Sequence, residues 1–163
     1  MAVSPKDILK HQIETMHYII KKMVDDISDE ESMRTLGTCP NHIRWQTGHL
    51  VFTAILAGKT FGADLKPQDG WNTIFGRGAE PPNKQTEFPS MDALRTTLYE
   101  FQKEVLTALA AAPDSLLEEK REIAPGWNDS PLNAVLFLSG HDFYHCGQIA
   151  MIRHDLGRER SFG

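Results

Sequence analysis

The sequence contains few cysteines and no long run of apolar residues. Its 163 residues include only Cys39 and Cys146, which are too few for a disulfide framework, so we expect both to be reduced thiols. No segment approaches the roughly 20 apolar residues that a bilayer requires, and the N-terminus lacks a basic region followed by an apolar one. These absences predict a cytoplasmic protein that has no membrane partner.

An excess of positive charge is also absent. The chain has 17 Lys and Arg residues against 22 Asp and Glu residues, which gives a formal net charge of -5. Binding to the nucleic-acid backbone needs a positive face, so nucleic acid is not an expected partner. The composition is 40% hydrophobic and 24% charged, as in a globular protein, and the length predicts one domain over residues 1–163.

No alternating strand pattern is comparable in length to the four helical patterns that the sequence contains. Caps and prolines typical of helix starts occur at Ser4-Pro5, after Cys39-Pro40, at Ser90 and at Ser130-Pro131. Apolar residues and histidines then recur at helical spacing, and the expected inward positions are Leu9, Ile13, Met16, Ile20, Val24 and Ile27; Trp45, His49, Phe52 and Leu56; Leu94, Leu98, Phe101, Val105 and Ala108; and Ala134, Phe137, Leu138, His141, His145, Gln148 and Ile152. The patterns predict an all-α four-helix bundle.

Two connections between the predicted helices have distinctive sequences. The connection from about Thr60 to Pro89 is long, rich in Gly and Pro, and contains Trp71 and Phe75. It is either a lid or a solvated excursion anchored by its two aromatic residues. The connection from Pro113 to Asp129 is shorter, and we expect a short strand or a turn within it.

His141 and His145 are one helical turn apart on an apolar face, so both imidazoles can reach a common ion at about 2.0 to 2.1 Å. A third ligand has to come from another helix, where His42 and His49 are candidates about 10 Å apart along the axis, so only one of them can share the ion. The alternative is a set of hydrogen-bonded core histidines. Burying several imidazoles without partners costs a few kcal/mol, which favours a shared divalent ion.

The neighbours of the histidine pair add further candidates. Asp142 is either a partner of a ligand, a general base or a solvated acid, since HDFYH resembles the zincin pattern HExxH. Cys146 points away from the ligand face and is interpreted as a bystander. Gln148 either forms a hydrogen bond near the site or belongs to a polar cluster in the core. Elsewhere, His17 falls near an apolar stripe, and His11 and His154 are expected to be solvated.

Gly48-His49 in a Trp-containing helix, together with His141-Asp142 and His145-Cys146-Gly147-Gln148-Ile149, resembles the DinB-like (DinB/YfiT) superfamily. The resemblance covers nearly the whole chain through helix order and spacing. It implies an up-down-down-up four-helix bundle with one metal-ligating histidine from the second helix and two from the fourth. On this basis the ligands are His49, His141 and His145, and His49 is selected over His42.

Three neutral histidines leave a coordination position open, as in catalytic metal sites. The resemblance implies a metal-dependent transferase that uses a low-molecular-weight thiol, although related hydrolases and isomerases exist. We therefore expect a divalent ion (Zn, Ni, Fe, Co or Mn), a small-molecule substrate and a catalytic role for Asp142. The alternatives are a zincin-like hydrolase and a non-catalytic metal-binding stress or interaction protein. Because related bundles often pair helices, we also expect a homodimer.

Overall fold

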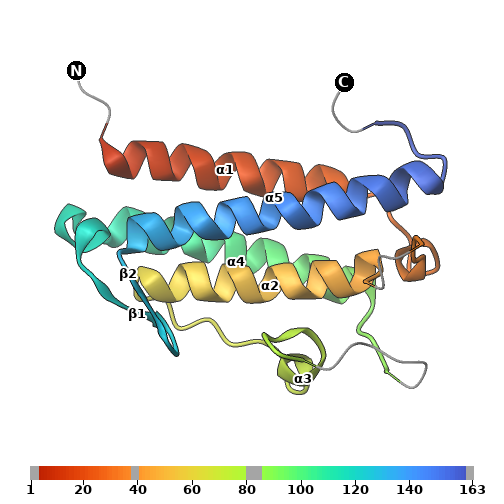
Figure 1. Cartoon of the computed structure of the whole chain (residues 1–163), viewed down its shortest axis with the longest axis horizontal. Helices are drawn as coiled ribbons and strands as arrows, with labels where there is room; N and C mark the ends of the chain where they lie inside the picture. Colours follow the sequence, from red (N-terminus) through yellow and green to blue (C-terminus); the bar gives the residue numbers. More distant parts are fainter. Residues whose placement is uncertain (1–3, 38–40, 80–85, 161–163) are drawn as a thin grey trace.

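The computed structural model describes residues 4–37, 41–79 and 86–160, and it confirms an all-α bundle (Figure 1). Four long helices form the bundle, and a short helix, two 3-10 turns and one hairpin lie in the connections between them. The elements are α1 (Pro5–Val24), η1 (Glu31–Met33), α2 (Ile43–Thr60), α3 (Trp71–Phe75), α4 (Met91–Ala111), η2 (Asp114–Glu118), β1 (Arg121–Ala124), β2 (Trp127–Asp129) and α5 (Pro131–Asp155). None of the described helices has the length and hydropathy needed to span a bilayer.

Three of the four predicted helix starts are confirmed by side-chain caps. The hydroxyl of Ser4 accepts a hydrogen bond from the backbone N–H of Asp7 at 3.1 Å, and Ser90 and Ser130 cap α4 and α5 in the same way. Cys39-Pro40, the expected start of the second helix, lies outside the described residues. The helix itself begins at Ile43, after His42 as its N-cap.

The long connection between α2 and α4 follows from the direction of these helices. α1 and α5 run one way along the bundle while α2 and α4 run the other, which is the up-down-down-up order (Figure 1). Because α2 and α4 are parallel, the chain has to return along the bundle, and an 18-residue helix is about 27 Å long. Trp71 and Phe75 are both buried, so they anchor this return against α2.

The central position of α2 changes one prediction about the core. Trp45, His49, Phe52 and Leu56 were expected on its inward face, but all four are only half-buried. The reason is that α2 contacts α4, α5, α3 and β1, so most of its surface is covered. Its fully buried residues are Ile43, Gln46, Thr47, Gly48, Leu50, Val51, Thr53, Ala54, Ala57, Gly58 and Thr60.

The hairpin confirms the expected strand or turn in the second connection. β1 and β2 pair antiparallel, with Arg121 opposite Asp129, and Gly126 makes the turn at φ 77°.

The prediction that Phe137 faces inward was wrong, because its side chain is 63% exposed at the edge of the apolar stripe of α5. Its ring packs edge-on against Trp127 of the hairpin, with centroids 5.3 Å apart.

An ion pair between the buried Arg153 and the half-exposed Asp26 links the residues after α1 to α5. The guanidinium of Arg153, which is 6% exposed, donates to both carboxylate oxygens of Asp26 and to the backbone carbonyl of Met23. The hydrogen bonds from Arg153 hold the pKa of Asp26 below its usual value of 3.8. The ion pair therefore stabilises the fold fully above about pH 3.8, where the carboxyl group is ionised in the unfolded chain as well. This stabilisation is lost as the pH falls through the lower pKa that Asp26 has in the folded state.

We expect Asp26→Asn to lower the free energy of unfolding by about 1 to 2 kcal/mol at neutral pH, because it leaves a buried cation without its counterion while Asp26 itself is half exposed. Urea denaturation at neutral pH and again below pH 3.8 is the measurement, and the difference from the unmodified chain should shrink in acid. Asp64→Asn, which breaks the exposed pair with Lys66, is the control and should have no measurable effect. Equal effects of both substitutions would contradict the prediction.

Candidate metal centre

The structure brings His49 of α2 together with His141 and His145 of α5. One ring nitrogen from each histidine lies within 4.8 Å of the other two. The ring centroid of His49 is 5.2 Å from that of His141 and 5.0 Å from that of His145. The cluster therefore joins two neighbouring antiparallel helices, and it consists of the three histidines named from the sequence.

The distance between the two histidines of α5 matches that of two ligands on one ion. The Nε2 atoms of His141 and His145 are 3.2 Å apart. Two nitrogens that each lie about 2.05 Å from a tetrahedral ion are about 3.3 Å apart. The donor set and its spacing thus fit a divalent metal without rearrangement of α5.

The other ring nitrogens of His49 and His145 are held by oxygen acceptors. The Nδ1 atom of His49 is 2.7 Å from the backbone carbonyl of Phe75, and the Nδ1 atom of His145 is 3.3 Å from the Oε1 atom of Gln46. Carbonyl oxygens only accept, so each Nδ1 carries the proton and donates it. The Nε2 atom of each ring is left with a lone pair, which is the form that binds a metal.

Asp142 provides the corresponding partner for His141. Its Oδ1 atom lies 3.4 Å from the Nδ1 atom of His141, a long contact in the direction expected for a carboxylate that orients a metal-ligating histidine. With both Nδ1 atoms protonated, the Nε2 lone pairs of His141 and His145 face each other at 3.2 Å. A cation between them removes that repulsion, so the hydrogen bonds around the rings support a metal site.

The electrostatic environment keeps two of these imidazoles neutral. Burial lowers the pKa of His145 to about 3, and the neighbouring His141 and His49 rings contribute further. Burial also lowers the pKa of His49, an effect partly opposed by its hydrogen bond to Phe75. At neutral pH the lone pairs of both rings are therefore available to a metal.

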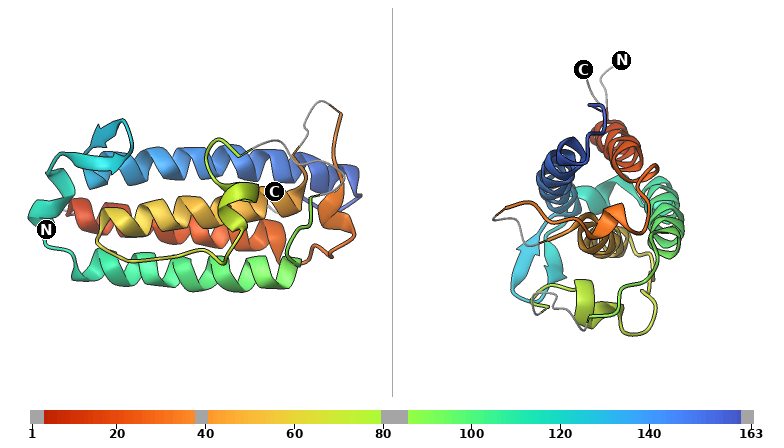
Figure 2. Two further views of the ribbon diagram at one scale, coloured as in Figure 1. Left: turned by 90° about the horizontal axis from the view of Figure 1, so that it is seen from below. Right: turned by 90° about the vertical axis from the view of Figure 1, so that its right-hand side faces the viewer.

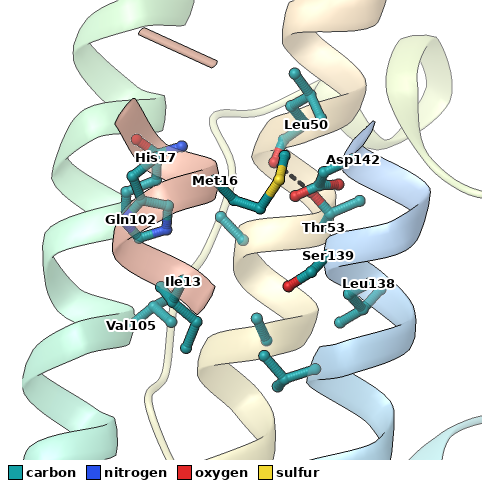
Figure 3. A pocket seen from close by; sticks show the side chains of 13 residues that line it. Ile13, Met16, His17, Leu50, Thr53, Gln102, Val105, Leu138, Ser139 and Asp142 are labelled. Atoms are coloured by element: carbon teal, nitrogen blue, oxygen red, sulfur yellow. Dashed lines mark hydrogen bonds between the residues drawn. The ribbon is translucent and has the colours of Figure 1, made fainter. Parts of the chain in front are cut away.

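The carboxyl group of Asp142 lies on the inner side of the histidine cluster. Figure 3 shows it directed into the bundle beside Thr53, Ser139 and Met16, where these residues line a cavity of about 30 Å³. Burial raises the pKa of this carboxyl group. This position favours the role of orienting His141, and the role of general base stays a prediction.

The remaining histidines lie outside the cluster. His42 is the N-cap of α2, and its Nδ1 atom accepts a hydrogen bond from the backbone N–H of Trp45 at 3.1 Å, so this candidate third ligand precedes the helix and is not part of the cluster. His17 lines the inner cavity near Gln102 (Figure 3), and burial lowers its pKa to about 4. His11 and His154 are exposed, as predicted.

Two other candidates near the pair have distinct environments. Burial raises the pKa of the Cys146 thiol to about 12, which argues against a role as a nucleophile and agrees with its interpretation as a bystander. Gln148 lies one turn beyond His145 on the same side of α5. Its Oε1 atom is buried and has no hydrogen-bond partner within the described part of the chain, so neither of its two expected roles is confirmed.

Gly48 allows α3 to approach the cluster. A Cβ atom at this position would lie 2.4 Å from the buried ring of Phe75. Because of this close packing, the carbonyl groups of Ile74 and Phe75 reach α2 and accept hydrogen bonds from Trp45 Nε1 at 2.9 Å and His49 Nδ1 at 2.7 Å. The backbone of α3 therefore sets the ring orientation of His49, and no sequence pattern predicted this contact.

Gly48→Ala is expected to displace Phe75, destabilise the fold by about 1 to 3 kcal/mol through overpacking, and weaken metal binding by misorienting His49. Thermal or urea denaturation and metal titration measure the two effects. In a Phe75→Ala background the same substitution meets no ring, so its additional cost should nearly vanish. An equal cost in both backgrounds would show that the Phe75 contact is not the cause.

Comparison with known proteins is consistent with this geometry. The family model described as the DinB superfamily matches residues 12–149. No curated protein matches the chain. Because the family match includes most of the chain and all three clustered histidines, the chain belongs to the DinB superfamily.

Proposed function

We propose that this DinB superfamily protein is a metal-dependent enzyme that binds one divalent ion through His49, His141 and His145 and acts on a small molecule. The observation that carries the proposal is the convergence of the three rings, each with its Nδ1 atom facing an oxygen acceptor. A core made only of structural histidines has no need for three ring nitrogens within 4.8 Å of one another. Such a site accepts Zn, Ni, Fe, Co or Mn, so the metal that it binds depends on which of these ions is available to the protein.

An ion held by His49, His141 and His145 would have a further coordination position for a substrate group. Such an ion lowers the pKa of a thiol or a water bound there and so supplies a nucleophile at neutral pH. The protein contributes orientation: Phe75, Gln46 and Asp142 accept hydrogen bonds from the Nδ1 atoms and so leave the Nε2 lone pairs free to bind an ion. The indole of Trp45, stacked on His49 at 4.9 Å, restricts the motion of that ring.

Transfer to a low-molecular-weight thiol is the first candidate reaction, and hydrolysis is the second. A cytoplasmic location belongs to this proposal, because such thiols stay reduced there. A zincin-like arrangement is less well supported. It needs a third ligand after His145, where His154 is exposed, whereas His49 of α2 supplies the third ring. The non-catalytic alternative is an ion that only ties α2 to α5.

Elemental analysis of untagged protein purified without added metal tests the binding step. We expect close to one divalent ion per chain, and a content far below one that added metal does not restore would contradict the proposal. Replacement of the ion by Co²⁺ then tests the open position. Addition of a low-molecular-weight thiol should change the visible absorption spectrum, and no change with any thiol or anion would favour the structural tie.

A screen of thiols with electrophilic substrates, run beside ester and amide hydrolysis, separates the two candidate reactions. Thiol-dependent turnover that requires the metal supports transfer, whereas turnover without a thiol supports hydrolysis. Metal-loaded protein that catalyses neither reaction would favour the non-catalytic alternative.

A further inference from the structure

A cavity with a polar lining lies inside the bundle, on the inner side of the histidine cluster. The right view of Figure 2 shows the four long helices around a common interior, and all four contribute to this cavity. Its polar residues are His17 of α1, Thr53 of α2, Gln102 of α4, and Ser139 and Asp142 of α5. We call it the polar cavity. The interior of a helical bundle is normally filled by apolar side chains, so several polar groups around one space need an explanation.

Three of these side chains have no hydrogen-bond partner in the part of the chain that the structure describes. Gln102 and Ser139 are each only 5% exposed, and His17 is half-buried. All three line the polar cavity, and Figure 3 draws no hydrogen bond from any of them. Buried polar groups are nearly always hydrogen-bonded, either to the protein or to an ordered water. Their partner therefore has to lie in the polar cavity.

The carboxyl group of Asp142 is also short of donors. Its contact with the Nδ1 atom of His141 is long, at 3.4 Å. Thr53 lies beside it, but the Thr53 hydroxyl donates to the backbone carbonyl of Leu50 at 2.8 Å. An ionised carboxylate only accepts hydrogen bonds and has about four positions for them. Figure 3 shows side chains that carry N–H groups across the polar cavity from Asp142, those of His17 and Gln102.

The polar cavity has the size and the polar groups that an ordered water requires. Its volume of about 30 Å³ exceeds the roughly 10 to 15 Å³ that one molecule needs, so it holds one or two. A buried water forms about three hydrogen bonds, and N–H groups, a hydroxyl and a carboxylate all line this space. Burial lowers the pKa of His17 to about 4, so its neutral ring adds no charge. A cation fits less well, because Asp142 is the only acidic residue of the lining.

We propose that one or two ordered waters in the polar cavity join the carboxylate of Asp142 to Gln102 and His17, and that Gln102 and His17 are positioning residues of the metal centre. The connection runs from α1 and α4 through the water to Asp142, and from there to the ligand His141. Ser139 lies on the same side of the polar cavity as Asp142, so its hydroxyl is not needed to span it. The positioning role rests on the proposed metal site, whereas the water bridge itself does not.

A variant that carries both His17→Leu and Gln102→Met tests the bridge without endangering the fold, because apolar side chains of similar volume replace polar ones that lack a partner. A high-resolution crystal structure of the metal-free chain should show one or two waters within hydrogen-bond distance of Asp142 and of Gln102 or His17. The double variant should lack them. NMR of the ring nitrogens in metal-free protein should show a smaller Nδ1-protonated fraction of His141 in the variant, because the carboxyl group is no longer fixed from the cavity side.

Metal affinity measures the positioning role. The double variant should bind the metal about 3- to 10-fold more weakly, which is less than the roughly 10- to 100-fold expected when a direct partner of a ligand is lost. In an Asp142→Asn background the same two substitutions should cause no further loss, because their effect passes through that carboxylate. Thr97→Val is the control, since Thr97 is 6% exposed on the same helix as Gln102 but does not line the polar cavity. It should change neither the metal affinity nor the protonation of His141.

An empty polar cavity, or a cation in place of the water, would overturn the proposal. So would a double variant that leaves both the protonation of His141 and the metal affinity unchanged, or one whose effect is as large in the Asp142→Asn background. A chain that binds no metal but shows the water and the change at His141 would refute the proposed function and leave the bridge intact. A chain that binds the metal but holds no water in the polar cavity would do the reverse.

Discussion

Replacement of His49, His141 or His145 by alanine is expected to reduce the metal content from close to one ion per chain to near zero. Each substitution removes one of three ligands, and two imidazoles hold a divalent ion weakly. The loss of affinity should exceed the roughly 10- to 100-fold that follows when only a hydrogen-bond partner of a ligand is removed. Elemental analysis after dialysis, and titration of metal into the stripped protein, measure this effect.

His42→Asn is the matched control for the three alanine variants. His42 lies on the same segment as His49 but caps α2, and asparagine keeps an acceptor for the backbone N–H of Trp45. This variant should retain the metal of the unmodified chain. If His49→Ala retained the metal and His42→Asn lost it, the assignment of His49 as the third ligand would be contradicted. Circular dichroism should show that all the variants remain helical.

The helices and the histidine pair were predictable because their signals are local. Ser4, Ser90 and Ser130 cap helices through contacts three residues away, and His141 and His145 share a face through the helical repeat alone. The third ligand was harder to choose. Spacing left both His42 and His49 open, and the family resemblance decided between them. A histidine as N-cap is unusual, so no local rule separated the cap from the ligand.

The surroundings of the cluster were not predictable from the sequence. The oxygen that holds His49 is a backbone carbonyl 26 residues away, and a carbonyl group has no residue-specific signature. Its position depends on how closely Phe75 packs against Gly48, which is a tertiary contact. The burial of α2 on most sides and the exposure of Phe137 likewise depend on which elements pack against these helices, and periodicity within one helix does not contain that information.

His145→Ala is also expected to abolish turnover while the fold is kept, because the apolar core of the bundle does not depend on that ring. Activity should be measured with the substrate pair found in the screen, with and without added metal. A metal-free variant that turns over at the rate of the unmodified chain would rule out chemistry at the ion and leave it a structural role at most.

Asp142→Asn distinguishes two roles of the carboxylate. If Asp142 is a general base, the substitution lowers kcat by about 10² to 10⁴ with the metal retained, and excess metal does not restore the rate. If Asp142 orients His141, metal affinity falls by about 10- to 100-fold and saturating metal restores most of the rate. The carboxyl group lies behind His141, directed into the bundle, so we expect the second result. Ser139→Ala, which alters the same cavity without a group that contacts His141, is the control and should change neither quantity strongly. A loss of kcat that persists at saturating metal would instead mean that Asp142 reaches the substrate, and the side chain would then have to leave the interior position that it occupies in this structure.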